Sequence, residues 1–323
     1  MRVLVVGAGA VGQTFGHHLQ RGGAEVHVLV KPAYGAEARS GYTLFDLRRG
    51  GVASPLSFRP DGVCTDADDV RKHPYDVVLI TVSSDALAAG SWLEELAEAA
   101  PDATIVGLQA GPGDWDRVRA AAGVERVCWG VIELIAYQSP LPGAADPEGV
   151  AFWIPSWLMF PFSGPSERVI PLVDAFRAGG LRSREVRDVI ALTAVGAPAL
   201  NLHMVALEAA GWSIDTLLAD PELLRLAGRS VQEASAASAH PLGVPVPWWI
   251  RAMRPWQLRV LAWVARRTIP IDLETYLRFH FTKMGVQTRM SLDGWIATAD
   301  RVGLESEAMR GIRARCEAVE RAA

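Results

Sequence analysis

The sequence predicts an α/β protein in which a parallel-sheet domain is followed by an all-helical domain. Four short runs rich in β-branched residues indicate buried strands, at 2–6, 25–30, 76–82 and 104–108. Helical stretches separate these runs, and such alternation requires a parallel sheet with right-handed crossovers. From Asp188 onward the strand patterns stop and helical periodicity continues. We therefore expect a sheet domain at 1–187 and a helical domain at 188–323, since a chain of 323 residues is long enough for two domains.

Further elements follow from the same patterns. In the sheet domain we expect helices at 11–22, 85–99 and 166–178, and a last strand near 181–186. Turn residues at Gly50-Gly51 and Pro140–Gly143 indicate hairpin or meandering strands at 42–56 and 126–162. The helical domain is expected to contain helices at 189–211, 214–218, 221–237, 247–267, 272–302 and 304–321.

Composition narrows the function classes. The net charge of −4 and the pI near 6.0 argue against a nucleic-acid partner, which requires a basic face. The three cysteines are far apart, without metal-ligand spacing, so we expect a cytoplasmic protein with no disulfide framework and no metal site. We also expect no integral membrane segment.

A glycine-rich loop begins the chain. Gly7, Gly9 and Gly12 form G-x-G-x-x-G directly between the first strand and the first helix. The first glycine permits a tight turn, the second lets the backbone approach a pyrophosphate, and the third allows close helix–strand packing. The pattern predicts a Rossmann-type dinucleotide site, to which the backbone of Ala10 and Val11 also contributes at the helix N-terminus. The alternative is a glycine-rich turn that binds nothing.

The residue after the second strand predicts the choice of nucleotide. Where a site for NAD carries an acidic residue for the ribose hydroxyls, this chain has Lys31, and Arg39 follows shortly after. A cation suits a 2′-phosphate, so Lys31 favours NADP as the cofactor. The alternative is a solvated lysine at the end of a strand.

An ordered series of segments resembles the ketopantoate reductase (2-dehydropantoate 2-reductase) family, within the 6-phosphogluconate-dehydrogenase-like group. The matching segments are GAGAVGQTFGHHL at 7–19, SGYTL at 40–44, DVVLITV at 76–82, TIVGLQAGPG at 104–113 and LDGWI at 292–296. The resemblance implies an NADPH-dependent reductase of a small carbonyl substrate, with a helical second domain for substrate binding and dimerisation. It also implies cofactor contacts at Thr81, Val82, Gln109 and Ala110.

The chain departs from the family pattern at its catalytic positions. Ser83 stands where the family's T-V-K motif has a lysine, and Ala110 replaces the asparagine of its L-Q-N-G loop. Gly196 or a neighbour occupies the position of the family's catalytic lysine, and Thr288 lies near the position of its carboxylate. The resemblance therefore supports cofactor binding more strongly than reduction of ketopantoate.

One polar stripe in the helical domain offers replacement chemistry. Tyr276, His280, Lys283 and Gln287 are spaced to lie along one side of an otherwise apolar helix, in a chain with only three lysines. Lys283 and His280 are therefore candidates for proton transfer, and Gln287 for substrate binding. The alternatives are a surface lysine and a histidine satisfied by packing. Asn201, near His203, is a further candidate for substrate binding or an amide that packs between helices.

The tryptophan-rich stretch 247–267 has three interpretations. Trp256, Val260 and Trp263 share one side of a helix that Pro255 limits, while Arg259 and Arg266 lie on another. A basic amphipathic helix can lie on a membrane, but a tryptophan stripe is more often buried within a chain or against a partner subunit. We therefore expect a core, lid or homodimer contact.

Two functions of different classes are consistent with these patterns, and a third, membrane-associated oxidoreduction, rests only on residues 247–267. The first is an NADPH-dependent reductase of a small 2-oxo acid or related carbonyl, built on the ketopantoate reductase plan with a rearranged acid. The second is an NADP-binding protein without hydride transfer, which acts as a sensor or regulatory partner. The missing family residues favour the second, and the polar stripe at 276–287 favours the first.

Overall fold

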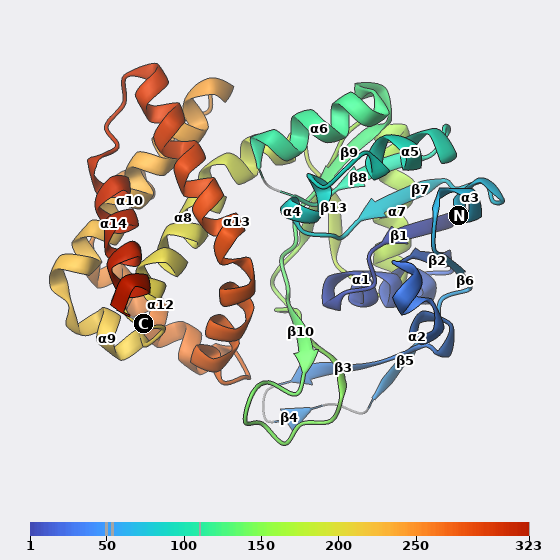
Figure 1. Cartoon of the computed structure of the whole chain (residues 1–323), viewed down its shortest axis with the longest axis horizontal. Helices are drawn as coiled ribbons and strands as arrows, with labels where there is room; N and C mark the ends of the chain where they lie inside the picture. Colours follow the sequence, from blue (N-terminus) through green and yellow to red (C-terminus); the bar gives the residue numbers. More distant parts are fainter. Residues whose placement is uncertain (49–50, 53–54, 110, 323) are drawn as a thin grey trace. The chain divides into compact units, whose positions relative to one another are not determined.

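The computed structural model describes residues 1–48, 51–52, 55–109 and 111–322. They divide into two compact units, Met1–Val189 and Ile190–Ala323 (Figure 1). The first unit contains the sheets and the second consists of helices. The predicted fold class is confirmed, whereas the roles assigned to the two domains remain predictions.

The main sheet places its first strand at a switch in strand order. Its eight strands follow the order β13-β12-β9-β8-β7-β1-β2-β6. In that order their bounds are Ser183–Glu185, Phe160–Ser163, Val127–Gly130, Thr104–Gly107, Val77–Ile80, Arg2–Val6, Glu25–Leu29 and Gly62–Cys64. Neighbouring strands are parallel except β9 and β12. The chain continues from β1 to β2 on one side, and β7 begins the other half of the sheet. In such sheets, ligands bind outside the carboxyl ends of the strands at this point.

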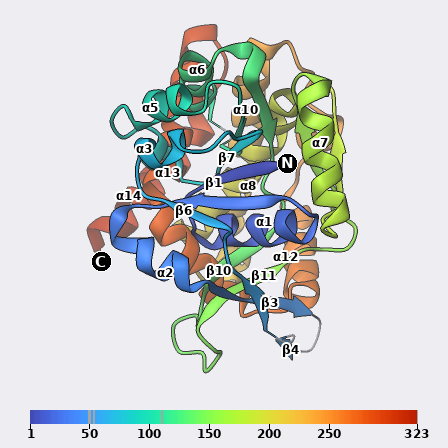
Figure 2. The ribbon, with the colours of Figure 1, turned by 90° about the vertical axis from the view of Figure 1, so that its right-hand side faces the viewer.

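Helices cover both faces of this sheet (Figures 1 and 2). Helices α1 and α7 contact each other on one face, and α3, α5 and α6 form the layer on the other. Their bounds are Ala10–Arg21, Ser166–Ala178, Ala67–Arg71, Trp92–Ala99 and Pro112–Ala122. Short helices also occur in this unit, η1 at Pro32–Tyr34, α2 at Gly35–Ser40, α4 at Ser84–Leu87 and η2 at Val124–Arg126.

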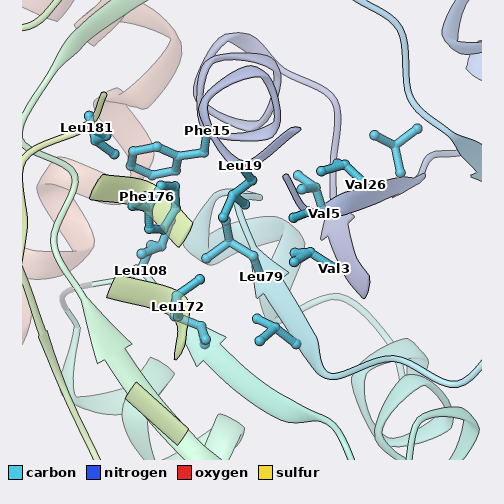
Figure 3. Close-up of a cluster of buried hydrophobic side chains, with 14 of the residues drawn as sticks. Val3, Val5, Phe15, Leu19, Val26, Leu79, Leu108, Leu172, Phe176 and Leu181 are labelled. Atoms are coloured by element: carbon cyan, nitrogen blue, oxygen red, sulfur yellow. The ribbon is translucent and has the colours of Figure 1, made fainter. Parts of the chain in front are cut away.

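The core between α1, α7 and the sheet is built from aromatic and aliphatic side chains (Figure 3). Phe15 of α1 meets Phe160 and Phe176 edge-on, with ring centroids 5.7 and 5.4 Å apart, and Phe162 stacks on Phe176 at 5.5 Å. All four rings are fully buried. Apolar residues at helical spacing on α7 supply this contact, which fixes α1 against the sheet.

A smaller sheet packs beside the main one. Its strands follow the order β10-β11-β3-β4, with β5 paired to β3. Their bounds are Ile135–Ser139, Gly149–Trp153, Tyr42–Arg48, Gly51–Val52 and Leu56–Phe58. Except for β5, which begins at the last residue of the predicted segment 42–56, these strands lie within the two segments for which the sequence indicates hairpins or meanders. Helix α1 contacts both β10 and β11.

Two predicted helices are interrupted, the one at 247–267, which forms α11 (Trp248–Arg251) and α12 (Pro255–Thr268), and the one at 85–99. The stretch 85–99 forms two helices, α4 and α5, rather than one. Gly90 adopts a φ of +73°, a conformation that side chains rarely permit, and the indole of Trp92 donates a hydrogen bond to the carbonyl oxygen of Ala86 at 2.9 Å. The turn at Gly90 therefore separates α4 from α5.

The helical unit is organised around α10. Its helices are α8 (Val189–Ala209, beginning at the last residue of the first unit), α9 (Ile214–Ala219), α10 (Pro221–Ala239), η3 (His240–Leu242), α11 (Trp248–Arg251), α12 (Pro255–Thr268), α13 (Leu273–Val302) and α14 (Glu307–Ala322). Helix α10 contacts α9, α11, α12, α13 and α14. Glu233 of α10 is buried and accepts hydrogen bonds from the backbone N–H groups of Ala308 (3.1 Å) and Met309 (2.9 Å). This carboxylate joins α10 to the first turn of α14, where a helix has unpaired N–H groups.

Helix α8 is the one described helix whose length and apolar character would allow it to cross a membrane. Half of its most apolar window is buried inside the protein, and the core helix of a soluble protein has the same properties. The three cysteines, Cys64, Cys128 and Cys316, are buried.

His18 predicts a loss of stability on acidification. Its Nδ1 lies 2.9 Å from the carbonyl oxygen of Gly179, its Nε2 has no partner among the described residues, and burial lowers its pKa from 6.5 to about 4. Between pH 6.5 and pH 4 the unfolded chain binds a proton at this histidine and the folded chain does not. The free energy of unfolding therefore decreases as the pH is lowered. When the pH is lowered from 7.5 to 5, we expect the free energy of unfolding of the His18→Gln variant to decrease by about 2 kcal/mol less than that of the parent.

Urea unfolding at the two pH values measures this difference, with the pH 7.5 value of each protein as its own reference. His203, whose pKa burial also lowers to about 4, acts in the same direction and remains in both proteins. An unchanged pH dependence in the variant would show that His18 is not responsible.

Candidate functional site

The glycine loop joins β1 to α1 with the geometry that close packing demands. Gly7 has a φ of +92°, and its N–H donates to the carbonyl oxygen of Leu29 at 2.9 Å. A Cβ at Gly12 would lie 2.0 Å from the carbonyl oxygen of Gly7, so only glycine fits there. A Cβ at Gly9, in contrast, would meet no protein atom within 4 Å. Gly9 precedes the first turn of α1, whose N–H groups at Ala10, Val11 and Gly12 are those that a helix leaves without intrahelical partners.

Thr81 holds this loop against the neighbouring strand. Its hydroxyl lies 2.9 Å from the carbonyl oxygen of Val6 and 2.7 Å from that of Gly7, and its N–H also donates to Val6, at 3.0 Å. Thr81 directly follows β7, so these contacts join the carboxyl end of β7 to the turn after β1. Thr81 thus lies beside the loop and contacts protein backbone, while its predicted contact with the cofactor remains a prediction.

A cavity of about 730 Å³ opens at this edge of the sheet, within the size range of cofactor sites. It is lined by the glycine loop, by the segments after β2, β6 and β7, and by two residues of the smaller sheet. The lining residues are Val6, Gly7, Ala8, Gly9, Gln13, Leu29, Val30, Lys31, Pro32, Tyr34, Glu37, Tyr42, Thr65, Asp66, Ala67, Val82, Ala86, Ala89, Trp92, Glu95, Leu96 and Gln138. Every one of them belongs to the first unit.

The cavity wall after β2 and β6 is polar. Lys31 lies two residues beyond β2, is exposed, and is followed by Pro32 at the start of η1. Glu37, Asp66 and Glu95 also line the cavity. Asp66 accepts a hydrogen bond from the N–H of Asp69 at 2.8 Å and so begins α3. The cavity therefore contains one ammonium group among carboxylates, and Lys31 is its only lysine or arginine among the described lining residues.

Gln109 is a buried residue that holds the backbone at the end of β7. It is buried and does not line the cavity. Its amide donates to the carbonyl oxygens of Val82 (2.6 Å) and Ile80 (3.3 Å), while its side-chain oxygen accepts from the N–H of Leu108 (3.1 Å). Val82 itself lines the cavity. Gln109 therefore positions the loop after β7, while Ala110 lies outside the described residues.

The sequence analysis missed a hydrogen-bonded pair, Ser84 and Asp114, whose members follow β7 and β8 along the chain. Ser84 Oγ donates to Asp114 Oδ2 at 2.7 Å, which links the start of α4 to the first turn of α6. Burial raises the pKa of Asp114 above its ordinary value, with the Ser84 hydrogen bond acting in the opposite direction. An aspartate in the first turn after β8 was visible in the sequence, but its partner thirty residues earlier was not.

In the helical unit the structure describes some of the predicted residues. His280 stacks on Tyr276, one turn earlier on α13, with ring centroids 5.4 Å apart, and meets Phe281 edge-on. Lys283 and Gln287 belong to α13, but their side chains lie outside the described part of the structure. Asn201 and His203 lie on α8, where Asn201 is half-buried. Gly196 of α8 is exposed, and a Cβ there would meet open space.

Helices α8 and α13 are joined by an ion pair that the sequence did not reveal. Arg289 Nη1 lies 2.8 Å from Glu208 Oε1, and both side chains are largely shielded from solvent. The pair fixes the register of α13, the helix that carries Lys283, against α8. Among the described residues, no group of three histidine, cysteine, aspartate or glutamate side chains is placed to hold a metal ion.

The glycine loop, the switch in strand order and the cavity are the features of a Rossmann-type α/β unit, which a helical unit follows. Residues 3–147 match the family model described as ketopantoate reductase PanE/ApbA. The resemblance to the ketopantoate reductase family is thereby confirmed. No curated protein sequence matches the chain.

Solved structures share the fold along the whole chain. A 2-dehydropantoate 2-reductase from Methylococcus capsulatus has a TM-score of 0.70 at 20% identity, covering 99% of this chain and 97% of its own. A D-mandelate dehydrogenase bound to NADH and anilino(oxo)acetate has a TM-score of 0.71 at 14% identity, with coverages of 100% and 99%. A dimeric ketopantoate reductase from Staphylococcus aureus has a TM-score of 0.67 at 14% identity, with 98% of each chain covered.

The two glycines of the loop predict separable effects. In Gly9→Ala the methyl group meets no protein atom but occupies space at the cavity, so we expect unchanged thermal stability and at least about tenfold weaker nucleotide binding. In Gly12→Ala the methyl group collides with the Gly7 carbonyl, so we expect a loss of stability of about 1–3 kcal/mol or more. Thermal unfolding and NADPH fluorescence titration measure the two effects. Equal nucleotide affinity of Gly9→Ala and the parent would contradict the assignment of this loop.

Proposed function

We propose that this protein is an NADPH-dependent reductase of a small 2-oxo acid or related carbonyl compound. The observation that carries the proposal is the cavity at the carboxyl edge of the sheet, with the glycine loop at one side and Lys31 at another. Relatives of the same fold support the substrate class, since one bears the name of a 2-dehydropantoate reductase and another binds an oxoacetate together with NADH.

The cavity has the features that a dinucleotide requires. Gly9 leaves open space beside the N-terminus of α1, where N–H groups and the helix dipole favour a pyrophosphate. Lys31, rather than an acid, follows β2 and provides the positive charge for a 2′-phosphate. We propose Gly7, Gly9, Ala10, Val11, Gly12 and Lys31 as the residues that contact NADP, with Thr81 and Gln109 positioning the loop and Val82.

The nucleotide, when bound, supplies the hydride for reduction of the carbonyl. The protein must then protonate the alkoxide oxygen or stabilise its charge. We propose Lys283 as the proton donor, with His280 beside it on the same helix and with Gln287 and Asn201 as substrate-binding groups. The packing of His280 on Tyr276 and Phe281 fixes its ring, and the Arg289–Glu208 ion pair fixes the helix that carries Lys283.

A second function is favoured by the departures from the family pattern. Ser83 and Gly196 provide no ammonium group where the family has lysines, and the space above Gly196 is open. An NADP-binding sensor or regulatory protein without hydride transfer would keep the cavity and dispense with both lysines. We also propose a homodimer, as in the relative described as dimeric, and a cytoplasmic location.

One experiment separates the two functions. NADPH titration by fluorescence measures binding, and NADPH oxidation against a panel of 2-oxo acids, ketopantoate included, measures reduction. Tight binding with oxidation by at least one acid supports the reductase. Tight binding without oxidation by any of them supports the sensor, and absence of binding would contradict both.

Lys31 predicts the nucleotide preference. We expect NADPH to bind more tightly than NADH, and the Lys31→Asp variant to reverse this order. A charged contact to the phosphate contributes ~1.5–3 kcal/mol, about 10- to 150-fold in affinity. Fluorescence titration with both nucleotides measures the ratio. Arg39→Asp is the control, because Arg39 does not line the cavity. Equal affinities of the parent protein for the two nucleotides would contradict the assignment to NADP.

Lys283 predicts a separation of turnover from binding. Loss of a general acid reduces rates by ~10²–10⁴, so we expect Lys283→Met to lower kcat by that order while NADPH affinity stays nearly unchanged. The exposed Arg278 on the same helix provides a matched control, Arg278→Met. Full turnover in Lys283→Met would show that this lysine is not the proton donor.

A further inference from the structure

Helix α12 turns its apolar side toward solvent. Trp256, Val260 and Trp263 are spaced along one side of the helix and have exposed fractions of 61%, 50% and 57%. Leu258, on the other side, is buried and packs inward. The predicted burial of this stripe in the core is wrong, because hydrophobic spacing reveals a stripe but not which side of the helix is packed.

The preceding helix also has exposed apolar side chains. Trp248 and Trp249 of α11 are 74% and 46% exposed. Pro255 begins α12 after the extended residue Arg254, so the two helices follow each other along the chain with a short break. We call the exposed side chains of 248–267 the tryptophan–arginine face. Large apolar side chains left exposed in such number mark a site of interaction.

The charged residues of the segment that carries this face all have the same sign. Residues 234–271 contain five arginines and no aspartate or glutamate, in a chain whose net charge is −4. Arg266 is neutralised by Asp215 (2.7 Å) and Glu274 (2.5 Å). The other four arginines form no ion pair with a carboxylate in the part of the chain that the structure describes. They are Arg251, Arg254, Arg259 and Arg267.

Tryptophan and arginine are also coupled within the face. The guanidinium of Arg267 lies 4.1 Å from the ring centroid of Trp263. This cation–π contact keeps a positive charge at the apolar surface rather than away from it. An occupant of the face must therefore accept indole rings and cations at the same depth.

A surface of anionic lipids meets these requirements better than a second copy of the chain. Indole rings favour the boundary between headgroups and acyl chains, and arginines bind anionic headgroups. Two copies meeting through this face would bring unpaired arginines together without a carboxylate from the same segment. Helix α12 has 14 residues and is about 21 Å long, too short to span a bilayer but suited to lie along its surface.

We propose that the tryptophan–arginine face docks the protein reversibly on an anionic membrane surface. Docking is peripheral: the rings of Trp256 and Trp263 enter the interface and the arginines contact headgroups. The face lies wholly within residues 248–267 of the second unit, whereas the residues that line the proposed nucleotide cavity all belong to the first unit. Docking and cofactor binding are therefore expected to be independent properties.

Vesicle co-sedimentation of the full chain tests this proposal. The probes are phosphatidylcholine vesicles with and without 30% phosphatidylglycerol. We expect the parent protein to bind the anionic vesicles, and the Trp256→Ala/Trp263→Ala variant to lose more than about tenfold in partition coefficient. The Arg251→Gln/Arg267→Gln variant should lose about fivefold per charge removed. Binding should also weaken between 0.1 and 0.5 M salt.

Matched controls use exposed residues of the first unit. Trp157→Ala removes a tryptophan that is 64% exposed, and Arg184→Gln/Arg187→Gln removes two exposed arginines, and neither should change vesicle binding. Light scattering without lipid tests the competing occupant. If the parent is a dimer that Trp256→Ala/Trp263→Ala converts to a monomer, the face is a subunit contact and the proposal is wrong. It is equally wrong if the parent ignores anionic vesicles, or if both face variants bind them as the parent does.

Discussion

The approach of α1 to the turn after β1 is the constraint on which the site depends. At Gly12 the helix lies so close to the Gly7 carbonyl that no side chain fits between them, and Thr81 binds the same carbonyl from the neighbouring strand. Three segments of the chain therefore meet at one peptide group. Because α1 is also held by the aromatic contacts of Phe15 with Phe160 and Phe176, its N-terminus cannot withdraw from the sheet edge without opening the core.

This constraint determines what the cavity can bind. A helix N-terminus at the carboxyl edge of a parallel sheet presents N–H groups and a positive dipole end to one region of the cavity. Glu37, Asp66 and Glu95 make other parts of the wall acidic, so the positive region is local. Under the proposed function, an anionic ligand would bind in one orientation, with its phosphates at the glycine loop. Lys31, which lines the cavity after the next strand, would then distinguish ligands with a further phosphate from those without.

The sequence predicted the features that depend on neighbours along the chain. The glycine spacing and the β-branched run before it are local, so the strand, loop and first helix could be predicted together. Gln109 could not be placed, because its amide binds Val82, 27 residues away, and this tertiary contact turns the side chain from the cavity. The break at Gly90 was missed, because the sequence does not give the backbone conformation of this glycine. Its positive φ is what ends the helix here. Which side of α12 faces outward depends on its contact with α10, and no local pattern contains that information.

The division of the chain into units explains why its functional signals differ in strength. All residues that line the cavity belong to the first unit. A loop that brings backbone N–H groups close to a phosphate requires glycine at fixed positions, and this requirement produces a glycine pattern that can be recognised in the sequence. The helical unit has no comparable requirement, because a proton donor needs only one correctly placed side chain. Gly196 or a neighbour stands where the resemblance implies a lysine, and α8 remains a continuous helix at this position. Under the proposed function, Lys283 on α13 would supply the proton instead, and this exchange would require no change of fold.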